Sequence, residues 1–191
     1  MEIVRRFASD GFLTEKRMKG LVMAETKQAT FLPTQPQTQK LPPRPGIEHR
    51  LLEVFIGKWI NEGHTVATAK APSVRIVTSD IYEWAPGGCF VLHYAYGLVG
   101  DNSGGGVELI GYDAATEKYI SHFFDSQGNI VISELTVRDD VWTWLGDWAG
   151  EGHRATSVFS SDGQIQKCLH ERSDDGVNWQ PSMEVVLTKS A

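Results

Sequence analysis

The chain has little of what marks a secreted or metal-binding protein. Only two of its 191 residues are cysteines, Cys89 and Cys168, and both fall within strand-like runs rather than in loops. Their spacing matches no zinc signature, so we expect two reduced, buried thiols and no metal site. Such cysteine usage is typical of a cytoplasmic protein.

Long apolar runs and a surplus of positive charge are also missing. No stretch approaches the ~20 apolar residues that a membrane helix requires. The charged start Met1–Arg6 is not followed by an apolar segment, which argues against a secretory signal. The formal net charge is -6, which leaves no basic surplus to neutralise phosphates. We therefore expect a cytoplasmic protein with neither a membrane nor a nucleic-acid partner.

Proline divides the chain near residue 46. Residues 31–46 hold five of the eight prolines, interspersed with Gln and Thr. Such a segment cannot form a regular ladder of backbone hydrogen bonds and favours an extended conformation. The sequence therefore predicts a polar, Pro-rich leader over residues 1–46 and a folded domain over residues 47–191. The leader is either a loosely docked arm or a strap that packs on a neighbouring subunit.

The folded domain is expected to begin with one short helix and to continue in short strands. Apolar residues at 47, 51, 54 and 55 share a helical face that begins after Pro45 and ends at Gly57. From there, runs of strand-forming residues alternate with connections rich in Gly, Asp and Asn. The predicted strands are about residues 57–67, 73–84, 88–98, 105–113, 117–124, 129–138, 141–149, 152–160, 164–173 and 179–189.

The spacing of the turns predicts the topology. Connections such as Pro86-Gly87-Gly88 and Ser161-Asp162-Gly163 are short enough to join neighbouring antiparallel strands. A meander of about ten strands removes its bare edges by closing on itself. We therefore predict an all-β fold: a closed antiparallel up-and-down barrel, wide enough to enclose a cavity.

Four motifs resemble those of a known family. They are Gly57-Lys58-Trp59 at the start of the first strand and the segments 83–88, 111–114 and 171–179. Together they resemble a large family of uncharacterised bacterial lipocalin-like (calycin) proteins, over residues 47–190. The resemblance implies that Trp59 plugs one end of the barrel and that Lys189, in place of the more usual Arg, packs over its ring. It implies no catalytic residues, because the family has no established set.

Alternation along the strands assigns side chains to the two faces of the sheet. In strand 88–98 we assign the larger aromatic set to the interior. That set is Phe90, Leu92, Tyr94 and Tyr96. In strand 164–173 the same reasoning turns Cys168 and His170 inward. The three tryptophans of strand 141–149 (Trp142, Trp144 and Trp148) share one face, where they either fill the barrel or form the wall of a site for a flat apolar ligand.

Six residues are candidates for lining the cavity. They are Tyr94, His122, Glu134, Trp142, Trp144 and His170. Together with His93, the histidines and Glu134 could act as acid and base, or hold a metal or haem, if they met inside the barrel. No His-x-His or His-x-x-x-His pair exists, so the sequence contains no local chelate, and we expect no metal and no cofactor.

The function expected from these features is binding of a small, largely apolar molecule in the cavity. An alternative is a lyase or isomerase that uses acid–base chemistry without a cofactor on a small hydrophobic substrate. A second alternative is an interaction module that forms a homodimer. The content of the cavity distinguishes them, because a binding protein needs an apolar wall with few polar anchors and an enzyme needs convergent titratable groups.

Overall fold

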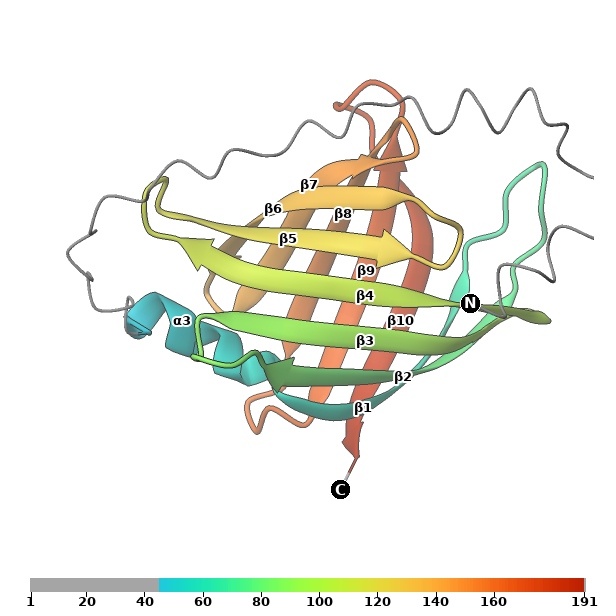
Figure 1. Ribbon diagram of the computed structural model, residues 1–191. Helices are drawn as coiled ribbons and strands as arrows, with labels where there is room; N and C mark the ends of the chain where they lie inside the picture. Colours follow the sequence, from blue (N-terminus) through green and yellow to red (C-terminus); the bar gives the residue numbers. More distant parts are fainter. Residues whose placement is uncertain (1–44, 191) are drawn as a thin grey trace, which may run out of the picture. The chain divides into compact units, whose positions relative to one another are not determined.

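Ten antiparallel strands close into a barrel in the computed structural model, which describes residues 45–190 (Figure 1). Each strand pairs with the next along the chain, and β1 pairs with β10 to complete the circle. This confirms the predicted fold class. The strands are β1 (Gly57–Thr65), β2 (Arg75–Trp84), β3 (Phe90–Val99), β4 (Asn102–Asp113), β5 (Lys118–Asp125), β6 (Ile130–Arg138), β7 (Val141–Trp148), β8 (Glu151–Phe159), β9 (Ile165–Ser173) and β10 (Gln180–Ser190).

The strand bounds agree with the predicted ones to within a few residues, except at the start of β4. We expected a loop up to residue 105, but β4 begins at Asn102 and pairs with the end of β3. Glycine makes this pairing possible. A Cβ on Gly105 would lie 2.0 Å from the carbonyl oxygen of Ala95, and its φ of +145° is unfavourable for other residues. The loop therefore shrinks to a tight turn.

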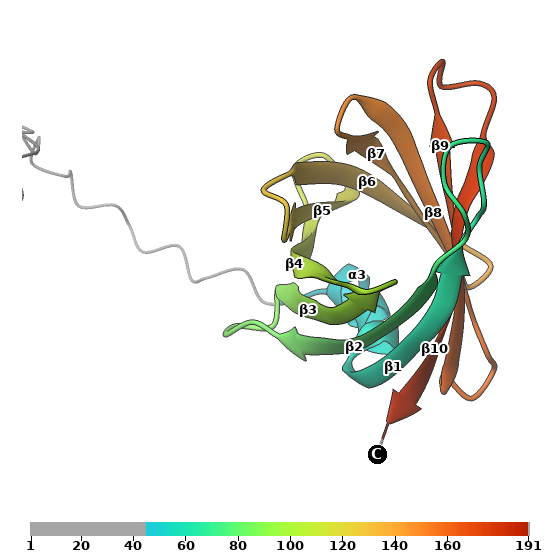
Figure 2. The same cartoon turned by 90° about the vertical axis from the view of Figure 1, so that its right-hand side faces the viewer.

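One end of the barrel is closed by the helical segment that precedes β1. The predicted helix is a short α3 (Ile47–Leu51) continued by a 3₁₀ turn, η1 (Leu52–Phe55). Figures 1 and 2 show α3 lying across the end of the ring of strands. Leu52 and Phe55 point into the barrel and are fully buried. None of the helices in residues 45–190 is long and apolar enough to cross a membrane.

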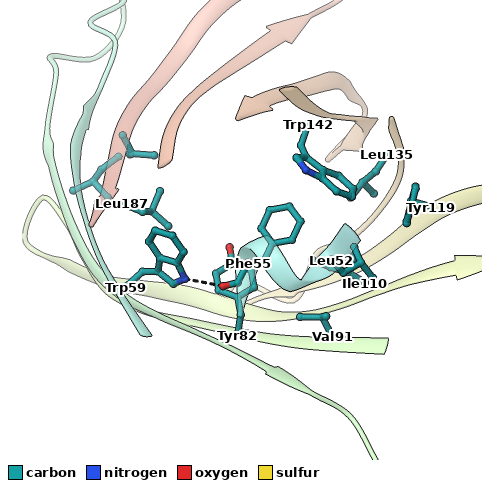
Figure 3. Packing of buried hydrophobic residues seen from close by; sticks show 12 residues of the cluster. Leu52, Phe55, Trp59, Tyr82, Val91, Ile110, Tyr119, Leu135, Trp142 and Leu187 are labelled. Atoms are coloured by element: carbon teal, nitrogen blue, oxygen red, sulfur yellow. Dashed lines mark hydrogen bonds between the residues drawn. The ribbon is translucent and has the colours of Figure 1, made fainter. Parts of the chain in front are cut away.

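Aromatic side chains fill the barrel beneath this helix (Figure 3). The indole nitrogen of Trp59 donates a hydrogen bond of 2.8 Å to the carbonyl oxygen of Phe55, which fixes the turn into β1. The ring of Phe55 packs edge-on against Trp142 with centroids 5.0 Å apart. Lys189 Nζ lies 5.0 Å from the centroid of the Trp59 ring. This is the geometry that the family resemblance implied, and the stabilising role of Trp59 remains a prediction.

The face assignment for β3 was wrong. Val91 and His93 are buried inside the barrel, whereas Phe90 and Tyr96 are exposed on its outer surface. The larger side chains of this strand lie on its outer face, so side-chain size did not decide the orientation. The inner face was decided by hydrogen bonding, because His93 finds two buried carboxylate partners there. The predicted leader, apart from residues 45 and 46, lies outside the described residues, and the domain boundary stays a prediction.

Candidate functional site

A cavity of about 710 Å³ occupies the end of the barrel opposite α3. Its rim is formed by the β3–β4, β5–β6 and β7–β8 connections, and its floor meets the aromatic core at Tyr82. Apolar side chains on its wall include Phe123, Trp144, Trp148 and Met183. Polar side chains occupy many other inward positions, so the cavity is amphipathic rather than simply apolar.

A buried network of three ionisable side chains lies deep on one wall of the cavity. Strand register builds it: His93 on β3 is directly opposite Glu108 on β4, and Asp80 on β2 is its diagonal neighbour. The Nδ1 of His93 lies 2.9 Å from Glu108 Oε2, and its Nε2 lies 3.2 Å from Asp80 Oδ2. The remaining oxygens are also bonded. Thr78 donates to Asp80 Oδ1 at 2.6 Å, and the Trp144 indole donates to Glu108 Oε1 at 3.2 Å.

The network holds His93 as an imidazolium. Burial alone would lower the pKa of His93, but its hydrogen bonds to Asp80 and Glu108 outweigh that effect and raise the pKa to about 9. Burial, together with the same two carboxylates, raises the pKa of the Tyr82 phenol well above its usual value. At neutral pH the ring of His93 is therefore an imidazolium and the side chain of Tyr82 a neutral phenol.

A second cluster, made of His153, His170 and Cys168, lies on β8 and β9. His153 Nε2 is 3.2 Å from His170 Nδ1, and His170 Nε2 is 3.3 Å from the Cys168 sulfur. Because His170 bonds through both ring nitrogens, the three groups form a chain. Within that chain a neutral His170 donates through one ring nitrogen and accepts through the other, whereas His153 takes part only through Nε2.

Desolvation keeps this second cluster uncharged. Burial, with a contribution from Arg172, lowers the pKa of His153 to about 4, and burial with a contribution from His153 lowers that of His170 to about 3. Burial raises the pKa of the Cys168 thiol to about 11. Glu108 contributes to the shifts of both His153 and Cys168, so the two clusters act on one another across the cavity.

Three buried polar atoms in the described part of the chain have no hydrogen-bond partner, and all belong to residues that line this cavity. They are Asn61 Oδ1, His153 Nδ1 and Gln166 Oε1. Buried polar atoms are normally bonded, so unpaired ones beside a cavity indicate groups that a ligand or water satisfies. No group of three His, Cys, Asp or Glu among residues 45–190 is arranged to hold a metal ion.

The six candidate residues from the sequence are divided among three places. Trp144 and His170 line the cavity. Trp142 faces inward but is buried in the aromatic core next to Phe55. Alternation turns the other three outward. Tyr94 follows the inward His93 in β3, and His122 is exposed between two inward residues of β5, Ser121 and Phe123. Glu134 is exposed, and its Oε2 lies 2.6 Å from Lys118 Nζ. The expectation that these three reach the cavity is therefore corrected.

Sequence reasoning missed Asp80, Glu108 and His153 and placed His93 on the wrong face. Glu108 stands between Val107 and Leu109, so alternation alone predicts that the carboxylate faces solvent. A different feature of the sequence could have indicated the polar interior. Ser121, Ser133 and Ser157 are all buried inward residues, which shows small polar residues on the inner face of several strands. Such a pattern indicates a polar cavity.

Comparisons with known proteins agree with this architecture. Residues 44–189 match the model of a family described as a protein of unknown function (DUF1579). The chain belongs to this family. The resemblance seen in the sequence motifs, to a family of unknown function with a lipocalin-like barrel, is thereby confirmed. No curated protein matches the chain by sequence.

Two solved structures share the barrel of this DUF1579 protein. The crystal structure of Rv2717c from M. tuberculosis superposes with a TM-score of 0.56 at 12% identity, covering 76% of this chain and 99% of that one. The S-type phycobiliprotein lyase CPES from Guillardia theta gives a TM-score of 0.56 at 10% identity, covering 82% of this chain and 99% of that one. At such identities the likeness shows the fold alone.

Proposed function

We propose that this protein binds a small molecule with an apolar body and a polar end inside the barrel cavity. The observation that carries the proposal is the cavity itself. Its volume of about 710 Å³ lies within the range of roughly 300–1,000 Å³ found for small-molecule sites. Trp144, Trp148 and Phe123 offer aromatic surface, and the Asp80–His93–Glu108 network offers a fixed polar anchor.

The polar anchor is organised before any ligand arrives. Each carboxylate oxygen of Asp80 and Glu108 already accepts a hydrogen bond from the protein. A ligand that bonds to these oxygens therefore pays little to order them. The structural neighbour named as an S-type phycobiliprotein lyase shows that a barrel of this fold occurs in a lyase. A cytoplasmic location and a homodimeric assembly remain part of the proposal.

Fluorescence titration with a neutral apolar probe, N-phenyl-1-naphthylamine, tests the proposal. We expect saturable binding that also quenches the cavity tryptophans. Ala155→Leu adds bulk inside the cavity and should weaken binding, whereas Thr156→Leu adds similar bulk on the outer face of the same strand and should not. Unsaturable probe fluorescence, or equal affinity in the two variants, would show that the cavity is not the binding site.

Acid–base catalysis in the same cavity is a second candidate. It is favoured by the unpaired Nδ1 of His153 beside the cavity, which is free to accept a proton from a bound substrate. Because the pKa of His153 is lowered to about 4, it is a weak base and the expected rate gain is modest. The benzisoxazole elimination of 5-nitrobenzisoxazole reports such a base without a natural substrate. Catalysis that is lost in His153→Gln but kept in the surface variant His122→Gln would support it, and a rate equal to that of free imidazole in both would exclude it.

A further inference from the structure

We infer that the cavity selects molecules whose polar end is a protonated amine and rejects those that end in a carboxylate. The inference rests on the proposed binding function and narrows it to a class of ligand. Two features of the cavity wall support it: the net charge of the lining side chains, and the hydrogen-bond acceptors that they offer to a ligand. Both follow from residues that line the same space.

The buried network carries one uncompensated negative charge. Both ring nitrogens of His93 face carboxylate oxygens, so both must carry protons and the ring is a single positive charge between two negative ones. The side chains of Asp80, His93 and Glu108 are only 5%, 10% and 10% exposed. At this depth, solvent screens a charge far less than it does at the surface.

No other cation on the described wall offsets that charge. Arg172 is the one Lys or Arg among the described lining residues, and it lies at the rim with its Nη1 3.5 Å from Glu151 and its side chain 57% exposed. His153 and His170 are neutral. Asp125, another lining residue near the rim, adds further negative charge. The formal charge of the described lining side chains is therefore negative, with Asp80, Glu108, Asp125 and Glu151 against His93 and Arg172.

The hydrogen-bonding groups favour the same ligand. Each carboxylate oxygen of Asp80 and Glu108 accepts one bond from the protein and keeps a second lone pair. Among the unpaired buried atoms, Asn61 Oδ1 and Gln166 Oε1 are also acceptors. An ammonium group brings three donors and no acceptor, and so matches this set. A ligand carboxylate brings acceptors only and would lose its hydration without gaining donors.

Three probes with the same aromatic body separate the contributions on the unmodified full-length protein. They are 1-naphthylmethylamine, 1-naphthalenemethanol and 1-naphthylacetate, which are cationic, neutral and anionic at pH 7. Binding is measured by calorimetry and by quenching of tryptophan fluorescence. We expect the amine to bind at least about tenfold more tightly than the alcohol, since a favourable buried charge pair exceeds 1.4 kcal/mol, and the acid to bind more weakly than the alcohol.

A matched pair of variants locates the preference. Glu108→Gln removes a negative charge from the network and should abolish the ratio of amine to alcohol affinity. Glu134→Gln makes the same change on the outside of the barrel, where Glu134 pairs with Lys118, and should leave the ratio unchanged. Melting curves and near-ultraviolet circular dichroism establish that both variants are folded, and the three-probe comparison on the parent protein stands without them.

The outcomes separate this inference from the proposed function. If the alcohol and the amine bind equally, or the acid binds best, the inference is overturned while small-molecule binding stands. If none of the three probes binds, the proposed function fails and the inference fails with it. A preference for the amine that survives Glu108→Gln and disappears in Glu134→Gln would also overturn it.

Discussion

The imidazole of His93 lies face to face with the phenol ring of Tyr82, with ring centroids 3.8 Å apart and planes within 7° of parallel. The other neighbour of Tyr82 is Phe55, stacked at 5.7 Å. The three rings form a column that runs from the helical cap at the closed end to the ionised network in the cavity. Tyr82 therefore covers one face of the imidazolium and separates it from the apolar core, and a cation stacked on an aromatic face is favoured.

The raised pKa of His93 predicts how stability changes in mild alkali. The folded value of about 9 exceeds the ordinary value of 6.5. The imidazolium therefore stabilises the folded state fully below pH 6.5, and this contribution is lost as the pH rises to about 9. This shift of the His93 pKa corresponds to a contribution of about 3 kcal/mol to the free energy of unfolding. Urea denaturation between pH 6.5 and 9 should show the free energy of unfolding fall in the parent and stay nearly flat in His93→Gln. His122→Gln, an exposed control, should behave like the parent.

The second cluster predicts a separate loss of stability in mild acid. The folded pKa values of His153 and His170 are lowered to about 4 and about 3. Below pH 6.5 the unfolded chain binds protons at these residues that the folded chain does not bind. The free energy of unfolding therefore decreases as the pH falls from 6.5 towards 4. The double variant His153→Gln/His170→Gln should have a flatter profile between pH 6.5 and 4.5. A parallel slope in parent and variant would contradict the lowered pKa values.

Trp59→Ala should be among the most damaging truncations in the barrel. Trp59 is 1% exposed, bonds to Phe55 and lies under Lys189. Truncating a buried indole costs roughly 3–5 kcal/mol, a large part of the ~5–15 kcal/mol by which a typical domain is stable. Chemical denaturation measures this directly. An unchanged midpoint would show that Trp59 does not act as the plug.

Trp142 and Trp144, two of the inward tryptophans of β7, should differ from one another. Trp142 is 3% exposed in the aromatic core, so Trp142→Ala should cost about as much stability as Trp59→Ala, roughly 3–5 kcal/mol. Trp144 lines the cavity and bonds to Glu108. Because its removal enlarges an existing cavity rather than opening a void in the packed core, Trp144→Ala should cost less stability and weaken binding of the apolar probe. Denaturation and probe titration of the two variants side by side check both statements.

Deletion of residues 1–45 should leave a folded, monodisperse barrel. Every strand, α3 and η1 lie within residues 47–190, and the ring of strands closes between β1 and β10. The truncated chain should melt within a few degrees of the full chain. Loss of cooperative melting would show that the leader is needed for folding. A change from dimer to monomer by light scattering would show that it joins two subunits.

The sequence by itself determined the short helical segment before β1 and the ten strands, whose bounds it predicted to within a few residues except at the start of β4. These features depend on local chemistry: turn residues between apolar runs, a helical face after Pro45, and the Gly57-Lys58-Trp59 motif at the start of β1. It also placed Cys168 and His170 on the inner face, because the neighbouring Lys167 and Glu171 favour solvent. Where one face of a strand is clearly polar and the other is not, alternation decides the orientation.

Only the tertiary structure decided which face of β3 and β4 looks inward and which groups meet in the cavity. Val91 and Ile110 lie inside as expected, but beside the cavity the apolar Tyr96 and Val107 lie outside and the ionisable His93 and Glu108 inside, the reverse of the usual pattern. Such an inversion is stable only when the buried charges bond to one another. That in turn depends on the register that brings His93 within hydrogen-bond distance of residues 13 and 15 positions away. Register is a property of paired strands, so no single segment of the sequence contains it.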